Sequence, residues 1–115
     1  MSFDVTIRVK NKPKFELNVG VANITYNVKT LVEKSSGWEM KNGEQSYPID
    51  KWARMITHGI SELRANPAKY RKYEAKNGWG TVENILDFYL QCLEMHRKLV
   101  LYYNGLLGCA VVYVN

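Results

Sequence analysis

The chain begins with a strict alternation of apolar and polar positions. Four apolar residues, each followed by a polar or charged one, predict a half-buried strand, and they are Phe3, Val5, Ile7 and Val9. Residues 11–14 have the composition of a turn, and a second alternation follows at residues 15–20. A β-hairpin is therefore the simplest interpretation of this part of the chain.

A third strand is predicted over residues 21–28. Successive side chains of a strand point to opposite faces, so Asn23, Thr25 and Asn27 are expected to share one face. This row of uncharged hydrogen-bonding groups suits recognition of a polar ligand, and a solvated sheet face is the alternative.

Two long segments have the three-and-four spacing of buried helices. Residues 49–65 carry one clean stripe, formed by Ile49, Trp52, Ala53, Ile56, Ile60 and Leu63. Residues 82–103 carry a stripe formed by Val82, Ile85, Leu86, Tyr89, Leu93, His96 and Val100, widened by Phe88, Leu90, Cys92 and Leu99. A helix this apolar must be buried on more than one side, either inside a small domain or against a second subunit, and a homo-oligomer is the expected state.

The turn Asn77-Gly78-Trp79-Gly80-Thr81 leads into the second long helix. Thr81 is expected to cap this helix, and the glycines let the chain turn sharply before it. Backbone N–H groups at such a helix start, here those of Gly80 and Thr81, favour an anion. Trp79 is expected either to stack on a purine or to close the corner between helices.

Further candidates lie on the helices and in the central loop. Arg54 and His58, one turn apart, form either a site for a phosphate or carboxylate or part of a solvated face. Trp38 is either a lid on the core or a stacking surface. The short helix expected over residues 68–76 mixes cations with Tyr70 and Tyr73, which are interpreted as core anchors in preference to base-stacking residues.

The C-terminal residues 106–114 are rich in β-branched side chains and predict a final strand that joins the N-terminal ones. The expected fold is α+β: a small, mainly antiparallel sheet packed on two long helices and one short helix. A length of 115 residues with 46% hydrophobic and 23% charged composition predicts one domain spanning residues 1–115.

The net charge and the two cysteines indicate which kind of partner and which cellular compartment to expect. The net charge of +5 and the pI near 9.2 favour an anionic partner. Cys92 and Cys109 lie in apolar runs and are interpreted as free thiols in a reducing cytoplasm. Neither a signal peptide nor a membrane-spanning segment is expected, so the predicted location is cytoplasmic.

The sequence does not favour an enzyme. His58 and His96 lie on separate predicted helices, and no cysteine lies at zinc-site spacing from histidine or cysteine. Asp87 and Glu94, a heptad apart, are better explained by a solvated helix face than by an acid–base pair. No catalytic residue, metal ligand or cofactor is predicted.

The opening Met1-Ser2-Phe3-Asp4-Val5, followed by Asn23-Ile24-Thr25-Tyr26-Asn27, resembles small phage and prophage accessory proteins. The resemblance covers about the first quarter of the chain and brings no catalytic residues with it. It implies a setting inside a bacterial host cell, where such proteins often act by binding, including inhibition or sequestration of defence components.

These observations predict a non-catalytic protein that binds and sequesters a small anionic ligand, such as a nucleotide-type defence signal. The predicted ligand-binding residues are Asn23, Thr25, Asn27, Arg54, His58, Trp79, Gly80 and Thr81. One alternative is a protein–protein interaction module that inhibits a bacterial defence enzyme. Another is nucleic-acid binding through Lys69, Arg71, Lys72 and Lys76.

Overall fold

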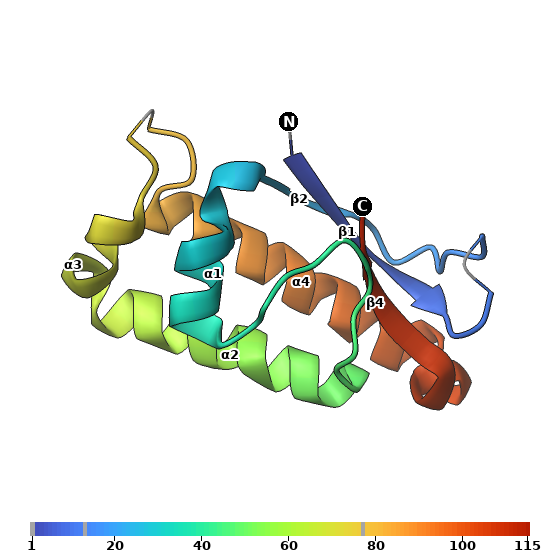
Figure 1. Ribbon diagram of the computed structural model, residues 1–115. Helices are drawn as coiled ribbons and strands as arrows, with labels where there is room; N and C mark the ends of the chain where they lie inside the picture. Colours follow the sequence, from blue (N-terminus) through green and yellow to red (C-terminus); the bar gives the residue numbers. More distant parts are fainter. Residues whose placement is uncertain (1, 13, 77) are drawn as a thin grey trace.

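The predicted α+β architecture is confirmed by the computed structural model, which describes residues 2–12, 14–76 and 78–115 (Figure 1). The predicted turns at residues 11–14 and 77–81 and the opening pentapeptide therefore each include one residue outside the described part. The strands are β1 (Ser2–Val9), β2 (Ala22–Thr25), β3 (Gly43–Glu44) and β4 (Ala110–Val114). The α-helices are α1 (Lys29–Ser36), α2 (Ile49–Ala65), α3 (Pro67–Tyr70) and α4 (Val82–Tyr102), and 3-10 turns are η1 (Tyr26–Val28), η2 (Arg71–Tyr73) and η3 (Asn104–Cys109).

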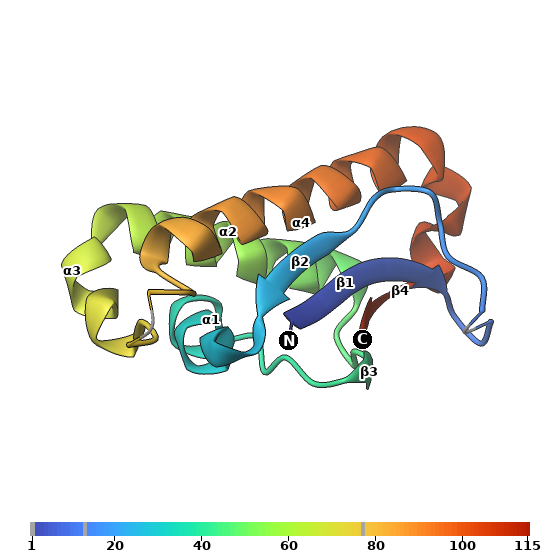
Figure 2. The same cartoon turned by 90° about the horizontal axis from the view of Figure 1, so that it is seen from above.

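Within the described residues the four strands form one antiparallel sheet in the order β2-β1-β4-β3. The central pair is formed by the first and last strands, with Val5 opposite Val114 and Val9 opposite Ala110. The alternation predicted for β1 is confirmed at Phe3, Val5 and Ile7, which are all buried, whereas Val9 is partly buried and Thr6 is buried as well. Figure 2 shows α2 and α4 running side by side along one face of this sheet.

Three of the strand predictions are wrong in extent. Residues 15–20 form no regular strand and contribute only an isolated bridge between Arg8 and Glu16. The third strand ends at Thr25, because the chain then winds into η1 with Val28 buried. Asn27 therefore lies on η1 and does not continue the row formed by Asn23 and Thr25. The final strand likewise starts at Ala110, after η3.

The stripe predicted for α2 is confirmed, since all six of its apolar residues are buried. Gly59 joins this face where α2 packs on α1 and α4. A Cβ atom at Gly59 would lie 2.6 Å from Cε2 of Tyr89 and 3.0 Å from Cβ of Ser36. Real Cβ atoms do not approach this closely, so the glycine allows the three helices to meet.

The buried side of α4 is rotated from the predicted stripe. The residues that face the core are Val82, Ile85, Phe88, Tyr89, Cys92, Met95 and Leu99. Leu86, Leu93 and His96 are only partly buried, and Leu90 and Val100 are exposed. One chain therefore covers one side of α4 and leaves apolar residues on the opposite side in solvent.

Trp38 lies at the centre of the core, which decides between its two interpretations. Its indole stacks on Phe88 with ring centroids 6.3 Å apart and meets Trp52 edge-on at 5.6 Å. Its Nε1 donates a hydrogen bond of 3.1 Å to Oε1 of Gln45, which is itself buried. The loop that carries Trp38 is thus anchored on the helices, and this tryptophan presents no surface to a partner.

Candidate functional site

The turn before α4 brings the chain close to η1. Gly78 and Gly80 have φ values of +79° and +91°, a region that glycine enters without strain. A Cβ atom at Gly80 would lie 2.6 Å from Cγ1 of Val28, so a side chain at this position would push the turn away from η1. The two glycines therefore place the intervening Trp79 beside the end of β2.

Side chains at the start of α4 accept the hydrogen bonds of its first backbone amides. Thr81 caps the helix as predicted, because its Oγ1 accepts a 3.2 Å hydrogen bond from the backbone nitrogen of Asn84. Oδ1 of Asn84 accepts hydrogen bonds of 3.1 Å from the backbone nitrogens of both Gly80 and Thr81. This reciprocal arrangement is a capping box.

A carboxylate also lies at this helix start. Oε2 of Glu74 accepts a 2.7 Å hydrogen bond from the backbone nitrogen of Val82 and one of 3.0 Å from Arg71. The amides of Gly80 and Thr81, which were expected to bind an external anion, therefore donate to Asn84, and the next amide, that of Val82, donates to Glu74. The predicted role of Gly80 and Thr81 as open donors is wrong for this reason.

Arg71 links two acidic residues across the turn. Its Nη1 donates to Glu74 and, at 2.8 Å, to Glu83 in the first turn of α4. The hydrogen bond from Arg71 lowers the pKa of Glu83. A carboxyl whose pKa is lower in the folded than in the unfolded state stabilises the fold at neutral pH, and that contribution is lost as the pH falls through the lowered pKa.

Glu74→Ala is expected to reduce the free energy of unfolding by about 1–2 kcal/mol, because it removes the acceptor for the Val82 amide and one partner of Arg71. Chemical denaturation measures this change. Glu39→Ala is the matched control, since among the described residues Glu39 forms one ion pair, an exposed one of 4.0 Å with Lys41. Equal effects of the two substitutions would contradict a capping role for Glu74.

A small open hollow lies between β2 and the start of α4, beside Trp79. Its volume is about 250 Å³, and it is lined by Asn23, Ile24, Thr25, Trp79, Gly80, Asn84 and Asp87. The indole of Trp79 is 67% exposed. Four of the predicted ligand-binding residues, Asn23, Thr25, Trp79 and Gly80, are therefore brought together although they come from distant parts of the sequence.

The other predicted residues do not contribute to this hollow. Arg54 and His58 are exposed on α2 and are not among its lining residues. Asn27 is exposed on η1, and Thr81 serves as the helix cap. Periodicity places side chains on one face of a helix but does not say which other element that face meets.

Two lining residues, Asn84 and Asp87, were not predicted as site residues. They lie three positions apart and so project from the same side of the first two turns of α4. The sequence signal that could have identified them is their three-residue spacing just after the capping residue Thr81 and close to Trp79. Asp87 also accepts a hydrogen bond of 3.0 Å from Gln91 on the next turn, which orients its carboxylate.

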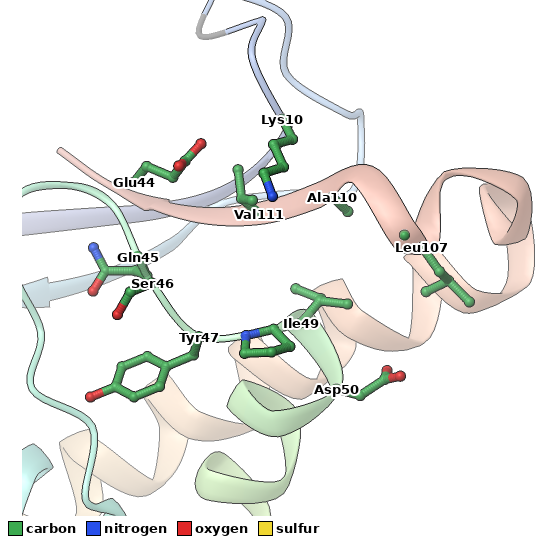
Figure 3. A pocket seen from close by; sticks show the side chains of 12 residues that line it. Lys10, Glu44, Gln45, Ser46, Tyr47, Ile49, Asp50, Leu107, Ala110 and Val111 are labelled. Carbon is green, nitrogen blue, oxygen red and sulfur yellow. The ribbon is translucent and has the colours of Figure 1, made fainter.

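A larger cleft of about 420 Å³ lies between the segment preceding α2 and strand β4 (Figure 3). Lys10, Glu44 and Asp50 bring charges of both signs to its lining. The buried amide of Gln45 also lines it, but that amide is occupied by hydrogen bonds to Trp38, Lys41 and Gly43. The cleft therefore has no consistent charge preference.

The basic segment considered for nucleic-acid binding is partly neutralised. Lys69 lies 3.9 Å from Glu62, and Arg71 contacts two glutamates. Tyr70 is buried, as its interpretation as a core anchor predicted, and its hydroxyl donates to Glu62 at 2.7 Å. Burial, together with this hydrogen bond, raises the pKa of Tyr70 to about 12. These contacts reduce the free positive charge available to a phosphate backbone.

Comparison of the chain with protein-family models, with curated proteins and with solved structures found no match. Across the described ranges, no helix is both long and apolar enough to cross a membrane. In the same ranges, no cluster of three or more histidine, cysteine, aspartate or glutamate side chains is placed to hold a metal ion. The candidate site is therefore identified from the geometry of the hollow beside Trp79 and not from a related protein.

Proposed function

We propose that the protein is a non-catalytic binding protein that holds a nucleotide-type ligand through its base in the hollow beside Trp79. The observation that carries this proposal is an exposed indole next to amide, hydroxyl and carboxylate groups from two separate elements. Stacking on an aromatic side chain is available to every nucleobase, because each has a planar π-face.

The polar groups of the hollow match the edge of such a base. Oδ1 of Asn84 accepts two backbone hydrogen bonds, which leaves its Nδ2 as a donor. Asp87 supplies a carboxylate acceptor one turn further along α4. A donor and an acceptor beside an indole suit a heterocycle that carries both kinds of group on its edge.

The same groups determine how the ligand is oriented. A carboxylate repels a phosphate, so Asp87 favours the base in the hollow and the phosphate directed away from it. The net charge of +5 favours an anionic ligand over a neutral one through the field of the whole protein. Sequestration of a nucleotide-type signal of bacterial defence is the form of this function that the resemblance to small phage proteins suggests.

Calorimetry against linear and cyclic nucleotides and the matching nucleosides tests the proposal. Trp79→Ala is expected to weaken binding by about tenfold or more, because base–aromatic stacking contributes roughly 1–3 kcal/mol. Phe15→Ala is the matched control, since Phe15 is also an exposed aromatic residue but does not line the hollow. Absence of heat and of thermal stabilisation across the panel would overturn the proposal, as would unchanged binding by Trp79→Ala.

A protein partner is the second candidate function. A hollow of about 250 Å³ is smaller than most small-molecule sites, and an exposed tryptophan among polar groups resembles the centre of a protein interface. In that case a stoichiometric protein partner should bind the wild type and the Phe15→Ala variant but not Trp79→Ala. Retention of the partner by Trp79→Ala would exclude this surface.

A further inference from the structure

The outer side of α4 carries four exposed residues in one line. Leu90 is 45% and Leu101 is 57% exposed, and Glu94 and Arg97 lie between them, also exposed. The spacings of four, three and four residues keep all four side chains on the same side of the helix. At 1.5 Å per residue, the line is about 16 Å long.

Along the helix the four residues are apolar, acidic, basic and apolar, so the pattern is complementary to itself when a second copy runs in the opposite direction. We propose that two copies of the chain associate through α4 in antiparallel orientation, about a two-fold axis that passes between the two helices at the level midway between Glu94 and Arg97. Each Leu90 then lies opposite Leu101 of the second copy, and each Glu94 lies opposite Arg97 of the second copy. A two-fold interface requires this kind of reciprocity.

The charges select the antiparallel orientation. In a parallel pair each Glu94 would face the second Glu94 and each Arg97 the second Arg97, which is repulsive. Within one chain, Nε of Arg97 donates to Glu94 at 2.9 Å, so the two side chains already point toward one another. In the antiparallel pair the four charges alternate in sign, and no charge at the centre is buried without a partner.

A groove beside Leu90 fits the same arrangement. It has a volume of about 320 Å³ and lies between α4 and the segment before β2, with Val21 and Leu90 on its walls. The proposed two-fold axis brings Tyr102 of the second copy to the level of this groove, on the same side of the helix pair. Tyr102 is 73% exposed and Val21 is 56% exposed in the single chain.

Apolar residues on the outer side of α4 extend the contact. Val100 is 40% exposed, and Leu86 and Leu93 are partly buried beside the line. Figure 2 shows α4 running along the outer edge of the molecule, where a second copy can approach it. The association accounts for a helix that is apolar on both its core side and its outer side.

Sedimentation velocity over a concentration series tests the proposal. The wild type is expected to form a dimer, and Glu94→Arg and Arg97→Glu are each expected to raise the dissociation constant by about tenfold or more. An equimolar mixture of these two variants should form a heterodimer with a dissociation constant within about threefold of the wild type. In that mixture the reversed charges face opposite charges again.

Formation of the heterodimer shows whether Glu94 and Arg97 act across an interface or only stabilise their own helix. Each single variant loses the ion pair within its own chain, and mixing two variants cannot restore that pair. Arg54→Glu is the matched control, because it reverses an exposed charge on α2 and should associate like the wild type. A wild type that is monomeric at every concentration, single variants that dimerise normally, or a mixture without heterodimer would each overturn the proposal.

Discussion

Trp38→Ala is expected to reduce the free energy of unfolding by about 3–5 kcal/mol, the range found for removal of a large aromatic side chain from a protein core. The indole is fully buried, stacks on Phe88 and contacts Trp52 edge-on. Its removal leaves a cavity bounded by two helices and also removes the donor to Gln45. Because most domains are stable by only about 5–15 kcal/mol, much of the fold's stability depends on this side chain.

Chemical denaturation followed by circular dichroism measures the change. Phe15→Ala removes an aromatic side chain at an exposed position and is expected to alter the free energy of unfolding by about 0.5 kcal/mol or less. Similar losses for both variants would mean that Trp38 is not the centre of the core.

Gly59→Ala is expected to reduce the free energy of unfolding by about 1–3 kcal/mol, the usual cost of overpacking. In an exposed helix interior the same substitution stabilises a protein by roughly 0.5–1 kcal/mol, because alanine loses less backbone entropy than glycine. Here the added methyl group would lie 2.6 Å from the ring of Tyr89. The hydroxyl of Tyr89 shares a 2.6 Å hydrogen bond with Oγ of Ser35 and donates one of 3.1 Å to the carbonyl oxygen of Val32, so the ring resists displacement.

Thermal unfolding of Gly59→Ala beside Gly105→Ala measures the effect of the contact. Apart from Gly105 and its two chain neighbours, no heavy atom of the described residues lies within 4 Å of a Cβ built at Gly105, so the control should leave the melting temperature nearly unchanged. A higher melting temperature for Gly59→Ala would contradict the tight approach of α2 to Tyr89.

Local patterns predicted most of the elements but not their limits. The alternation around Val5 and the stripe through Trp52 depend on neighbours in sequence, and both are confirmed. The stripe predicted for α4 is rotated from the core side, although the stripe and the residues that widen it include six of the seven buried residues. The helix is apolar on two sides, and a sequence pattern does not say which side its own chain covers. The end of β2 at Thr25 depends on the packing of Val28 beneath the turn that contains Gly80.

Part of the candidate site could be predicted from the sequence, and part could not. Trp79, Gly80 and the polar residues Asn23 and Thr25 were chosen for their chemistry, and the fold places them around one hollow. The expected anion site failed because Asn84 accepts the hydrogen bonds from the amides of Gly80 and Thr81, while Glu74 accepts the one from Val82. A carboxylate eight positions before Val82 gives no signal of this in the sequence. Whether the hollow binds a base stays a prediction.

The pairing of β1 with β4 has a consequence for the order of folding. Val9 and Ala110, which lie opposite one another in the sheet, are separated by 101 positions in the chain (110 − 9). Closing so long a loop costs entropy before its contacts form, and such topologies fold slowly. During synthesis, the helices emerge from the ribosome before β4, which pairs with β1 at the centre of the sheet. The sheet can therefore form completely only after β4 has been synthesised.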